Sequence, residues 1–173
     1  SRFRMIERGD NRSMVSMKIL ELESRIFALE QRKTQATSSR IITPDLDSDQ
    51  SASGDVASFV AAAALAFGDV CYLNSSSQLA LTDADAAATS FTMGMALATI
   101  AANTKGTFLL EGFVRNDAWN WTGGGILYLD TTTAGGMTQT APSGVDDVII
   151  VVGVAYSADI VYFRPSGVIV VHV

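Results

Sequence analysis

Residues 14–33 of the chain, MVSMKILELESRIFALEQRK, carry the pattern of a coiled-coil helix. Apolar residues follow one another in steps of 4, 3, 4 and 3, at Val15, Ile19, Leu22, Ile26 and Leu29. This is the a/d spacing of a heptad, with the two isoleucines at position a and the other three residues at position d. No Gly or Pro interrupts the stretch, and most of its residues are good helix formers. The alternative is a single amphipathic helix that packs on the chain's own domain.

The charges beside this apolar seam favour parallel helices. Lys18 and Arg25 fall at position g, and Glu23 and Glu30 fall at position e. In a parallel, in-register coiled coil, position g faces position e of the next heptad on the neighbouring chain. Lys18 would then face Glu23, and Arg25 would face Glu30. An antiparallel pairing would instead bring like charges together.

The stretch Arg25-Ile26-Phe27-Ala28-Leu29-Glu30 bears on the number of helices. It resembles the short trimerisation motif of three-stranded coiled coils, which implies that the Arg25 stem packs along the d-position residue and its guanidinium pairs with Glu30 of the next chain. Isoleucine at a with leucine at d leans toward dimers by itself. The motif favours a homotrimer, with a dimer as the alternative. The expected trimer interface comprises Val15, Ile19, Leu22, Arg25, Ile26, Leu29 and Glu30.

The segments on either side of the stalk differ from it in composition. Residues 9–13, GDNRS, predict a break followed by a helix start, so that residues 1–13 form an N-terminal anchor segment. Residues 34–55 are rich in Ser, Thr and Asp, which predicts a linker or extended arm. Residues 56–173 remain as one head domain.

Composition excludes several classes of protein. Residues 1–40 carry nine basic and five acidic side chains, whereas residues 41–173 carry three basic and thirteen acidic ones. An acidic body argues against nucleic acid as a partner. The single cysteine excludes an intramolecular disulfide framework. No apolar run approaches the length of a transmembrane span, so we expect no membrane insertion.

The head has the pattern of a mainly β domain. Short runs rich in Val, Ile, Leu, Tyr and Phe are separated by Gly, Asn and Ser turns, which predicts a β-sandwich or jelly-roll-like head. The Ala-rich residues 61–66 and 86–88 could be helical by propensity, but we expect residues 56–66 to form a strand. The other expected strands are residues 68–73, 107–114 (with a glycine bulge), 125–129, 148–155, 160–163 and 168–173.

Eight pieces of the head form a pattern when they are taken together. They are GDVCYL (68–73), LALTDAD (79–85), GMAL (94–97), GTFLLEGFVR (106–115), AWNW (118–121), GILYL (125–129), TQTAP (138–142) and VVGVAYSADIVYFR (151–164). In this order they resemble the small β domain that ends many tailed-phage fibre and head-decoration proteins. The resemblance implies a structural virion protein without catalysis, assembled in the host cytoplasm. Its N-terminal part would attach to other virion proteins, of the capsid or of the tail.

Residues that could carry chemistry are few. The one histidine, His172, lies in an apolar run, and no set of His and Cys has the spacing of metal ligands. Cys71 stands between Val70 and Tyr72 in an expected strand, which indicates a small buried hydrophobe rather than a nucleophile. We therefore predict no catalytic residue, no metal, no cofactor and no enzymatic activity.

The aromatic residues Trp119, Trp121 and Tyr128 are the candidates for ligand or interface contacts. Trp119 and Trp121 alternate along the chain, so in a strand both rings would lie on one face. Such a pair fills a subunit interface or the core, or it stacks on a sugar ring. Stacking on a sugar ring leads to the alternative function, a phage tail adhesin that binds a host-surface glycan or receptor.

Overall fold

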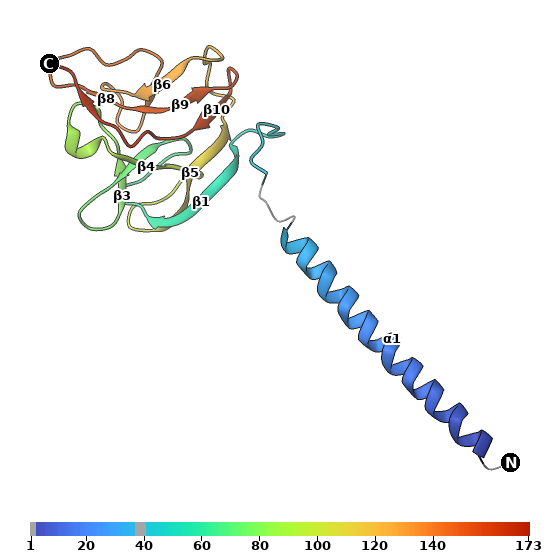
Figure 1. Cartoon of the computed structure of the whole chain (residues 1–173). Coiled ribbons are helices and arrows are strands. Elements are labelled where there is room, and N and C mark those ends of the chain that lie inside the picture. Colours follow the sequence, from blue (N-terminus) through green and yellow to red (C-terminus); the bar gives the residue numbers. More distant parts are fainter. Residues whose placement is uncertain (1–2, 37–40) are drawn as a thin grey trace. The chain divides into compact units, whose positions relative to one another are not determined.

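The chain forms two compact units, Ser1–Ile41 and Ile42–Val173 (Figure 1). The computed structural model describes the backbone of residues 3–36 and 41–173, and the side chains of residues 12–29 and 41–173. Within the first unit, α1 extends over Phe3–Ala36, 34 residues, or about 51 Å at a rise of 1.5 Å per residue.

The helix continues through residues 9–13, so the expected break between an anchor segment and the stalk is wrong. One glycine in a helix costs only about 1 kcal/mol relative to alanine. Gly9 is preceded by Glu7 and Arg8, which are good helix formers, and Arg12 lies three residues after it. The backbone of residues 3–13 therefore belongs to the same helix as the heptads.

The second unit is mainly β, as predicted. The first strand begins at Ser51, inside the stretch expected to be a linker, and ends at Val60, short of the expected Ala-rich end. The expected strand at residues 148–155 is divided at Ile150, and residues 87–89 form a 3-10 turn, η1. The strands are β1 (Ser51–Val60), β2 (Val70–Leu73), β3 (Leu79–Leu81), β4 (Thr92–Ala96), β5 (Lys105–Arg115), β6 (Ile126–Leu129), β7 (Met137–Thr138), β8 (Val148–Ile149), β9 (Val151–Ala155), β10 (Ile160–Phe163) and β11 (Val170–Val171).

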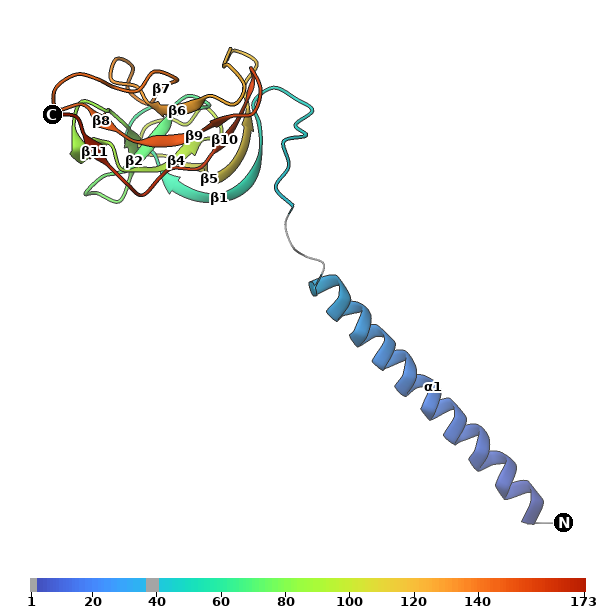
Figure 2. The same ribbon diagram turned by 45° about the horizontal axis from the view of Figure 1, so that its top comes forward.

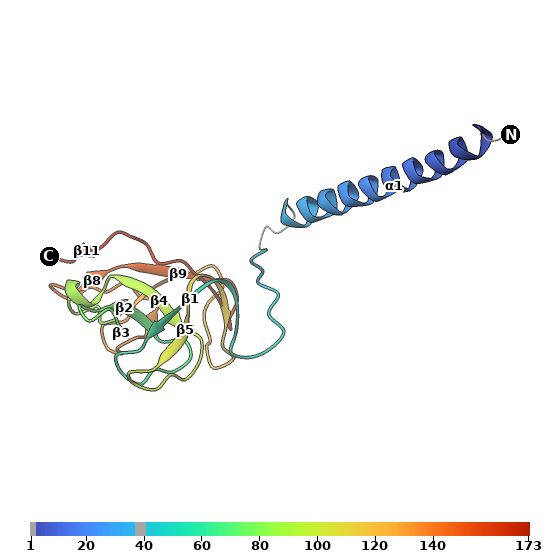
Figure 3. The same cartoon turned by 90° about the horizontal axis from the view of Figure 1, so that it is seen from below.

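One curled antiparallel sheet of nine strands replaces the two facing sheets of a sandwich (Figures 1 and 2). The strand order is β3-β2-β4-β5-β10-β9-β6-β7, with β1 also paired to β5, and β8 and β11 form a separate ribbon. β5 is the strand at which the sheet forks. β1 pairs along one edge of β5, and Figure 3 shows the two strands side by side. On the other edge, β4 pairs at residues 108–109 and β10 pairs at residues 112–115.

A bulge and a pair of glycines make this fork. The register of β1 and β5 passes from Asp55↔Glu111 to Val56↔Leu109, so Leu110 is the extra residue. Next to it, Gly54 pairs with Gly112, whose φ is +148°. A Cβ on either glycine would collide with the backbone of the opposite strand. A bulge bends a strand and increases its twist. The bend lets β5 pair with two diverging branches of the sheet, one formed by β4, β2 and β3 and the other by β10, β9, β6 and β7.

The two branches meet again through backbone hydrogen bonds and enclose the core. The amide of Val70 donates to the carbonyl of Gly135 (2.9 Å), and the amide of Val148 donates to the carbonyl of Ala84 (2.7 Å). The main core lies inside this closure and contains Val70, Ala84, Met95, Leu109, Val114, Leu127, Leu129, Ile150, Val152, Ala155, Val161 and Phe163. A second core covers the other face of β2, β4 and β5 and contains Ala61, Leu65, Cys71, Leu79, Ala96, Ile100 and Phe108.

Candidate interaction surfaces

The apolar seam of α1 is exposed. The relative exposure of its five residues lies between 50% and 62%, for Val15, Ile19, Leu22, Ile26 and Leu29. At 100° per residue these side chains lie along one side of the helix. Arg25 is also exposed, whereas the side chain of Glu30 lies outside the described residues. The described part of the chain places the five apolar residues on one accessible stripe with Arg25 beside it, and it contains no second α-helix that could pair with them.

A second apolar stripe on α1 escaped the heptad analysis. Met14, Met17, Leu20 and Phe27 are 55% to 67% exposed. They fall at heptad positions b, c and f, on the side of the helix away from the seam. The signal is present in the sequence, but an a/d template does not count these positions.

Trp119 and Trp121 lie in the loop between β5 and β6, so the alternation that would place both rings on one face of a strand does not apply. Asn116 makes the turn: its side-chain oxygen accepts a hydrogen bond from the amide of Ala118 (3.0 Å), and its carbonyl accepts one from the amide of Trp119 (3.0 Å). The two rings nevertheless lie together, with centroids 6.1 Å apart and an angle of 51° between their planes. Both are half-buried and pack against the main core.

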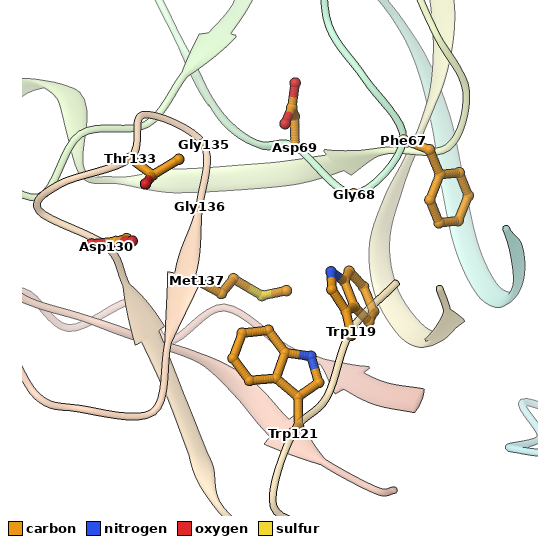
Figure 4. Close-up of a pocket in the computed structure, with 10 residues that line it drawn as sticks. All are labelled: Phe67, Gly68, Asp69, Trp119, Trp121, Asp130, Thr133, Gly135, Gly136 and Met137. Carbon is orange, nitrogen blue, oxygen red and sulfur yellow. The ribbon is translucent and has the colours of Figure 1, made fainter. Parts of the chain in front are cut away.

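These indoles form one side of an open pocket of about 270 Å³. Figure 4 shows the two rings together with Met137 beside them, and Asp130 and Thr133 across the pocket. The remaining lining residues are Phe67, Gly68, Asp69, Gly135 and Gly136. Tyr128 is not among them. It lies in β6 opposite Thr138 and Val151, so the structure brings the two tryptophans together and leaves the third predicted aromatic elsewhere.

The two carboxyl groups of the pocket have opposite environments. Burial raises the pKa of Asp69, and the hydrogen bond from the amide of Ala66 (2.8 Å) only partly offsets it. Burial also acts to raise the pKa of Asp130, but hydrogen bonds from Thr132 and its neighbours lower it overall. The amide and the hydroxyl of Thr132 both donate to Oδ1 of Asp130 at 2.8 Å. Asp130 is therefore the carboxylate held in its charged form.

A second pocket of about 350 Å³ adjoins the first one at Asp130. Four threonines supply much of its lining, which also includes Asp147: Thr131, Thr132, Thr138 and Thr140. Sequence reasoning missed it because the threonines come from the loop after β6 and from the segment at and beyond β7. Only the fold brings these two parts together.

The residues considered for chemistry do not gather into a reactive site. Cys71 is buried in the second core, and burial, assisted by the nearby charge of Asp69, raises the pKa of its thiol to about 12. His172 sits in the C-terminal ribbon, where its amide donates to the carbonyl of Asp147 (2.8 Å). Among the described residues, no group of three His, Cys, Asp or Glu side chains could hold a metal ion.

None of the helical residues that the structure describes forms a segment long and apolar enough to cross a membrane. Comparison of the sequence with models of known protein families gives no match, and comparison with curated protein sequences gives none either.

Proposed function

We propose that the chain is a structural protein of a tailed-phage particle, a homotrimeric fibre or decoration protein without catalysis. In this proposal α1 holds three copies in parallel, its N-terminal part attaches to other virion proteins, and each copy displays one β head. The observation that carries the proposal is the exposed apolar seam along α1.

The seam needs a partner helix. A fully buried Leu or Ile side chain stabilises a fold by about 1.5–3 kcal/mol relative to an exposed one, and all five seam residues are at least half exposed. A lone helix in water is also marginal, because most helix stability in proteins comes from the packing of an apolar face. Association through the seam satisfies both requirements.

Charge and motif favour three parallel copies. Lys18, Glu23 and Arg25 are exposed beside the seam, where parallel association pairs opposite charges between chains. The stem of Arg25 can cover the apolar seam while its guanidinium bonds a carboxylate of the next chain. Two partner helices around each α1 also cover more of the seam than one does.

The head supports a role in display. Its two cores are built from its own residues, and no group of three His, Cys, Asp or Glu side chains among the described residues could hold a metal ion. The pieces of sequence that resemble phage fibre and decoration domains cover the same unit. A self-contained β head on an associating helix is the arrangement such proteins need. The second apolar stripe of α1, at Met14, Met17, Leu20 and Phe27, supports contact of the N-terminal part with other virion proteins.

Light scattering of the purified chain tests the proposal. We expect a mass of about 55 kDa, three times the 18.3 kDa of one chain, and co-purification of the protein with intact phage particles. A monomer at micromolar concentration would overturn the trimer, and absence from the particle fraction would overturn the virion role.

The pocket at Trp119 and Trp121 supports a second candidate function, a tail adhesin that binds a host-surface glycan. The apolar face of a sugar ring stacks on an indole, and its hydroxyls can donate to a charged carboxylate such as Asp130. The adjoining threonine pocket would take a second ring. Each volume lies near the lower limit for small-ligand pockets, which suits single sugar units.

A glycan array with the full chain distinguishes this candidate from a purely structural role. Binding that is lost in Trp119→Ala and Asp130→Asn but kept in Tyr128→Ala would support the adhesin, because Tyr128 is a half-buried aromatic outside the pocket. Equal binding by all three variants would assign the glycan to another surface. No binding by the unmodified chain would remove the candidate.

A further inference from the structure

A row of apolar residues crosses the outer face of four neighbouring strands of the head. The register aligns Ile126 of β6 with Val154 of β9, Val154 with Tyr162 of β10, and Tyr162 with Phe113 of β5. Their chain neighbours Leu127, Phe163 and Val114 point into the main core, so this row faces outward. Tyr156 adds to it beyond the end of β9. We name this surface the outer patch: Phe113, Ile126, Val154, Tyr156 and Tyr162.

The outer patch has the composition of a protein interface. Ile126, Val154 and Tyr156 are 46%, 40% and 57% exposed. Phe113 contacts both tyrosines, with ring centroids 5.7 Å from Tyr156 and 4.9 Å from Tyr162. Aromatic residues held in place by their neighbours, together with exposed aliphatic ones, are typical of interface centres.

Charged residues of both signs surround the patch. Tyr162 donates a hydrogen bond to Glu111 (2.7 Å), and the exposed Arg164 lies 3.7 Å from the same carboxylate. On the other side, Arg115 pairs with Asp117 at 2.6 Å. These arginines are two of only three basic residues among residues 41–173, which carry thirteen acidic ones. A rim with both signs complements a second copy of itself, because basic groups of one copy can meet the acidic surface of the next.

The patch lies at the end of the head where the chain enters. Arg115 donates a hydrogen bond to the carbonyl of Leu46 (2.8 Å), and the amide of Asp117 donates to Asp49 (2.8 Å). In Figures 1 and 2 the entering segment runs beside the ends of β5 and β10. Few residues separate Ala36, the end of α1, from Ile42, where the head unit begins. A short tether of this kind gives linked modules a high effective concentration.

We infer that the outer patch is a head-to-head interface with a second copy of this chain. The inference rests on the proposed parallel trimer, because parallel stalks bring the entry ends of three heads together, and with them three outer patches. The heads then cover one another's apolar faces. Burial of these faces between the heads also explains why residues 41–173 carry so few charged side chains.

Cysteine labelling of the full chain tests the interface. Val154→Cys introduces a thiol into the patch, and Leu73→Cys introduces one on β2, at a similar exposure of 47%. The natural Cys71 should not react with a maleimide, because its side chain is buried and burial raises the pKa of its thiol to about 12. Each variant is labelled in the normal chain and in a chain with Ile19→Asp and Ile26→Asp, which break the seam.

We expect the Val154→Cys thiol to react about tenfold more slowly in the trimer than in the seam-broken chain, since labelling would require local opening of the interface. The Leu73→Cys thiol should react at the same rate in the normal chain and in the seam-broken chain. Slow reaction of Val154→Cys in both backgrounds would support the interface if the seam-broken chain is still an oligomer by light scattering, and it would overturn the interface if that chain is a monomer.

The outcomes separate this inference from the proposed function. A trimer in which Val154→Cys reacts as fast as Leu73→Cys would overturn the interface and leave the trimeric stalk standing. A monomeric normal chain would overturn both. Ile126→Cys, on the adjacent strand, repeats the measurement, and far-UV circular dichroism confirms that each variant keeps its fold.

Discussion

At the scale of single residues, Asp69 and Asp130 line one pocket yet influence stability in opposite directions with pH. The pKa of Asp130 is lowered in the fold, so its charged form stabilises the head above the unfolded pKa of about 3.9, and that contribution disappears as the pH falls through the folded pKa. The pKa of Asp69 is raised. Its contribution is therefore complete below the unfolded value and is lost as the pH rises through the folded pKa.

We predict that asparagine in place of each aspartate changes the melting temperature at neutral pH in opposite directions. Asp69→Asn should raise the melting temperature at neutral pH, because asparagine can still accept the hydrogen bond from Ala66 without a buried charge. Asp130→Asn should lower the melting temperature at neutral pH. The Asp69→Asn difference should disappear as the pH falls below the unfolded pKa of about 3.9, whereas the Asp130→Asn difference should persist to lower pH, until the pH falls below the lowered folded pKa of Asp130. Thermal unfolding between pH 3 and pH 8 measures this, and equal signs for the two variants would contradict it.

Gly112 gives a second prediction at this scale. Gly112→Ala should destabilise the head by about 2 kcal/mol or more, because the added Cβ would collide with the backbone of Ser53 and φ is +148°. Gly167→Ala is the matched control: nothing lies within 4 Å of its Cβ position. Urea denaturation should leave that control within about 0.5 kcal/mol of the unmodified chain. Similar midpoints for both variants would mean that the strands at the fork can separate without cost.

At the scale of elements, sequence reasoning succeeded where a pattern is local. Strands β2, β5, β6 and β10 follow from runs of apolar residues bounded by turns. A bulge within residues 107–114 is expected from the sequence, and one is present at Leu110. The fork itself could not be predicted, because it depends on the pairing of Gly54 with Gly112, which lie far apart in the chain. Trp119 and Trp121 lie together although their segment is a loop, where the alternation of a strand gives no guide to the direction of a side chain. Tyr128 lies on β6, outside their pocket.

The prediction at this scale concerns α1. Arg25→Ala should weaken trimer association about tenfold, roughly 1.4 kcal/mol, because the variant removes both the apolar stem and the charge of the expected interchain pair. The mass should shift toward dimers or monomers at low micromolar concentration, while the strand signal in circular dichroism stays unchanged. Glu21→Ala removes an exposed charge from position c of the same helix, away from the seam, and should change nothing. Unaltered association of Arg25→Ala in sedimentation equilibrium would show that other contacts determine the oligomeric state.

At the scale of the whole molecule, the proposed function gives separate tasks to the two units of the chain, and the spectroscopic signals of the two units can be measured apart. Both tryptophans lie in the head, so fluorescence reports the unfolding of the head alone. The helical signal at 222 nm reports α1, the only α-helix among the described residues. Stability that depends on association varies with protein concentration, whereas the stability of an independent fold does not.

Ile19→Asp with Ile26→Asp should therefore produce a monomer whose helical signal falls, because most of the stability of a helix in a protein comes from the packing of its apolar face. The fluorescence transition of the head should remain cooperative, since residues 42–173 contain both cores. Its midpoint should fall only by the contribution of the outer patch. Leu20→Asp with Phe27→Asp is the control on the second apolar stripe, at positions b, which face away from the seam. This control should stay trimeric with both transitions unchanged. A seam-broken chain without a cooperative fluorescence transition would mean that the head folds only in the assembly. Dissociation of the Leu20→Asp, Phe27→Asp control would mean that the helices contact one another through the second apolar stripe and not through the seam.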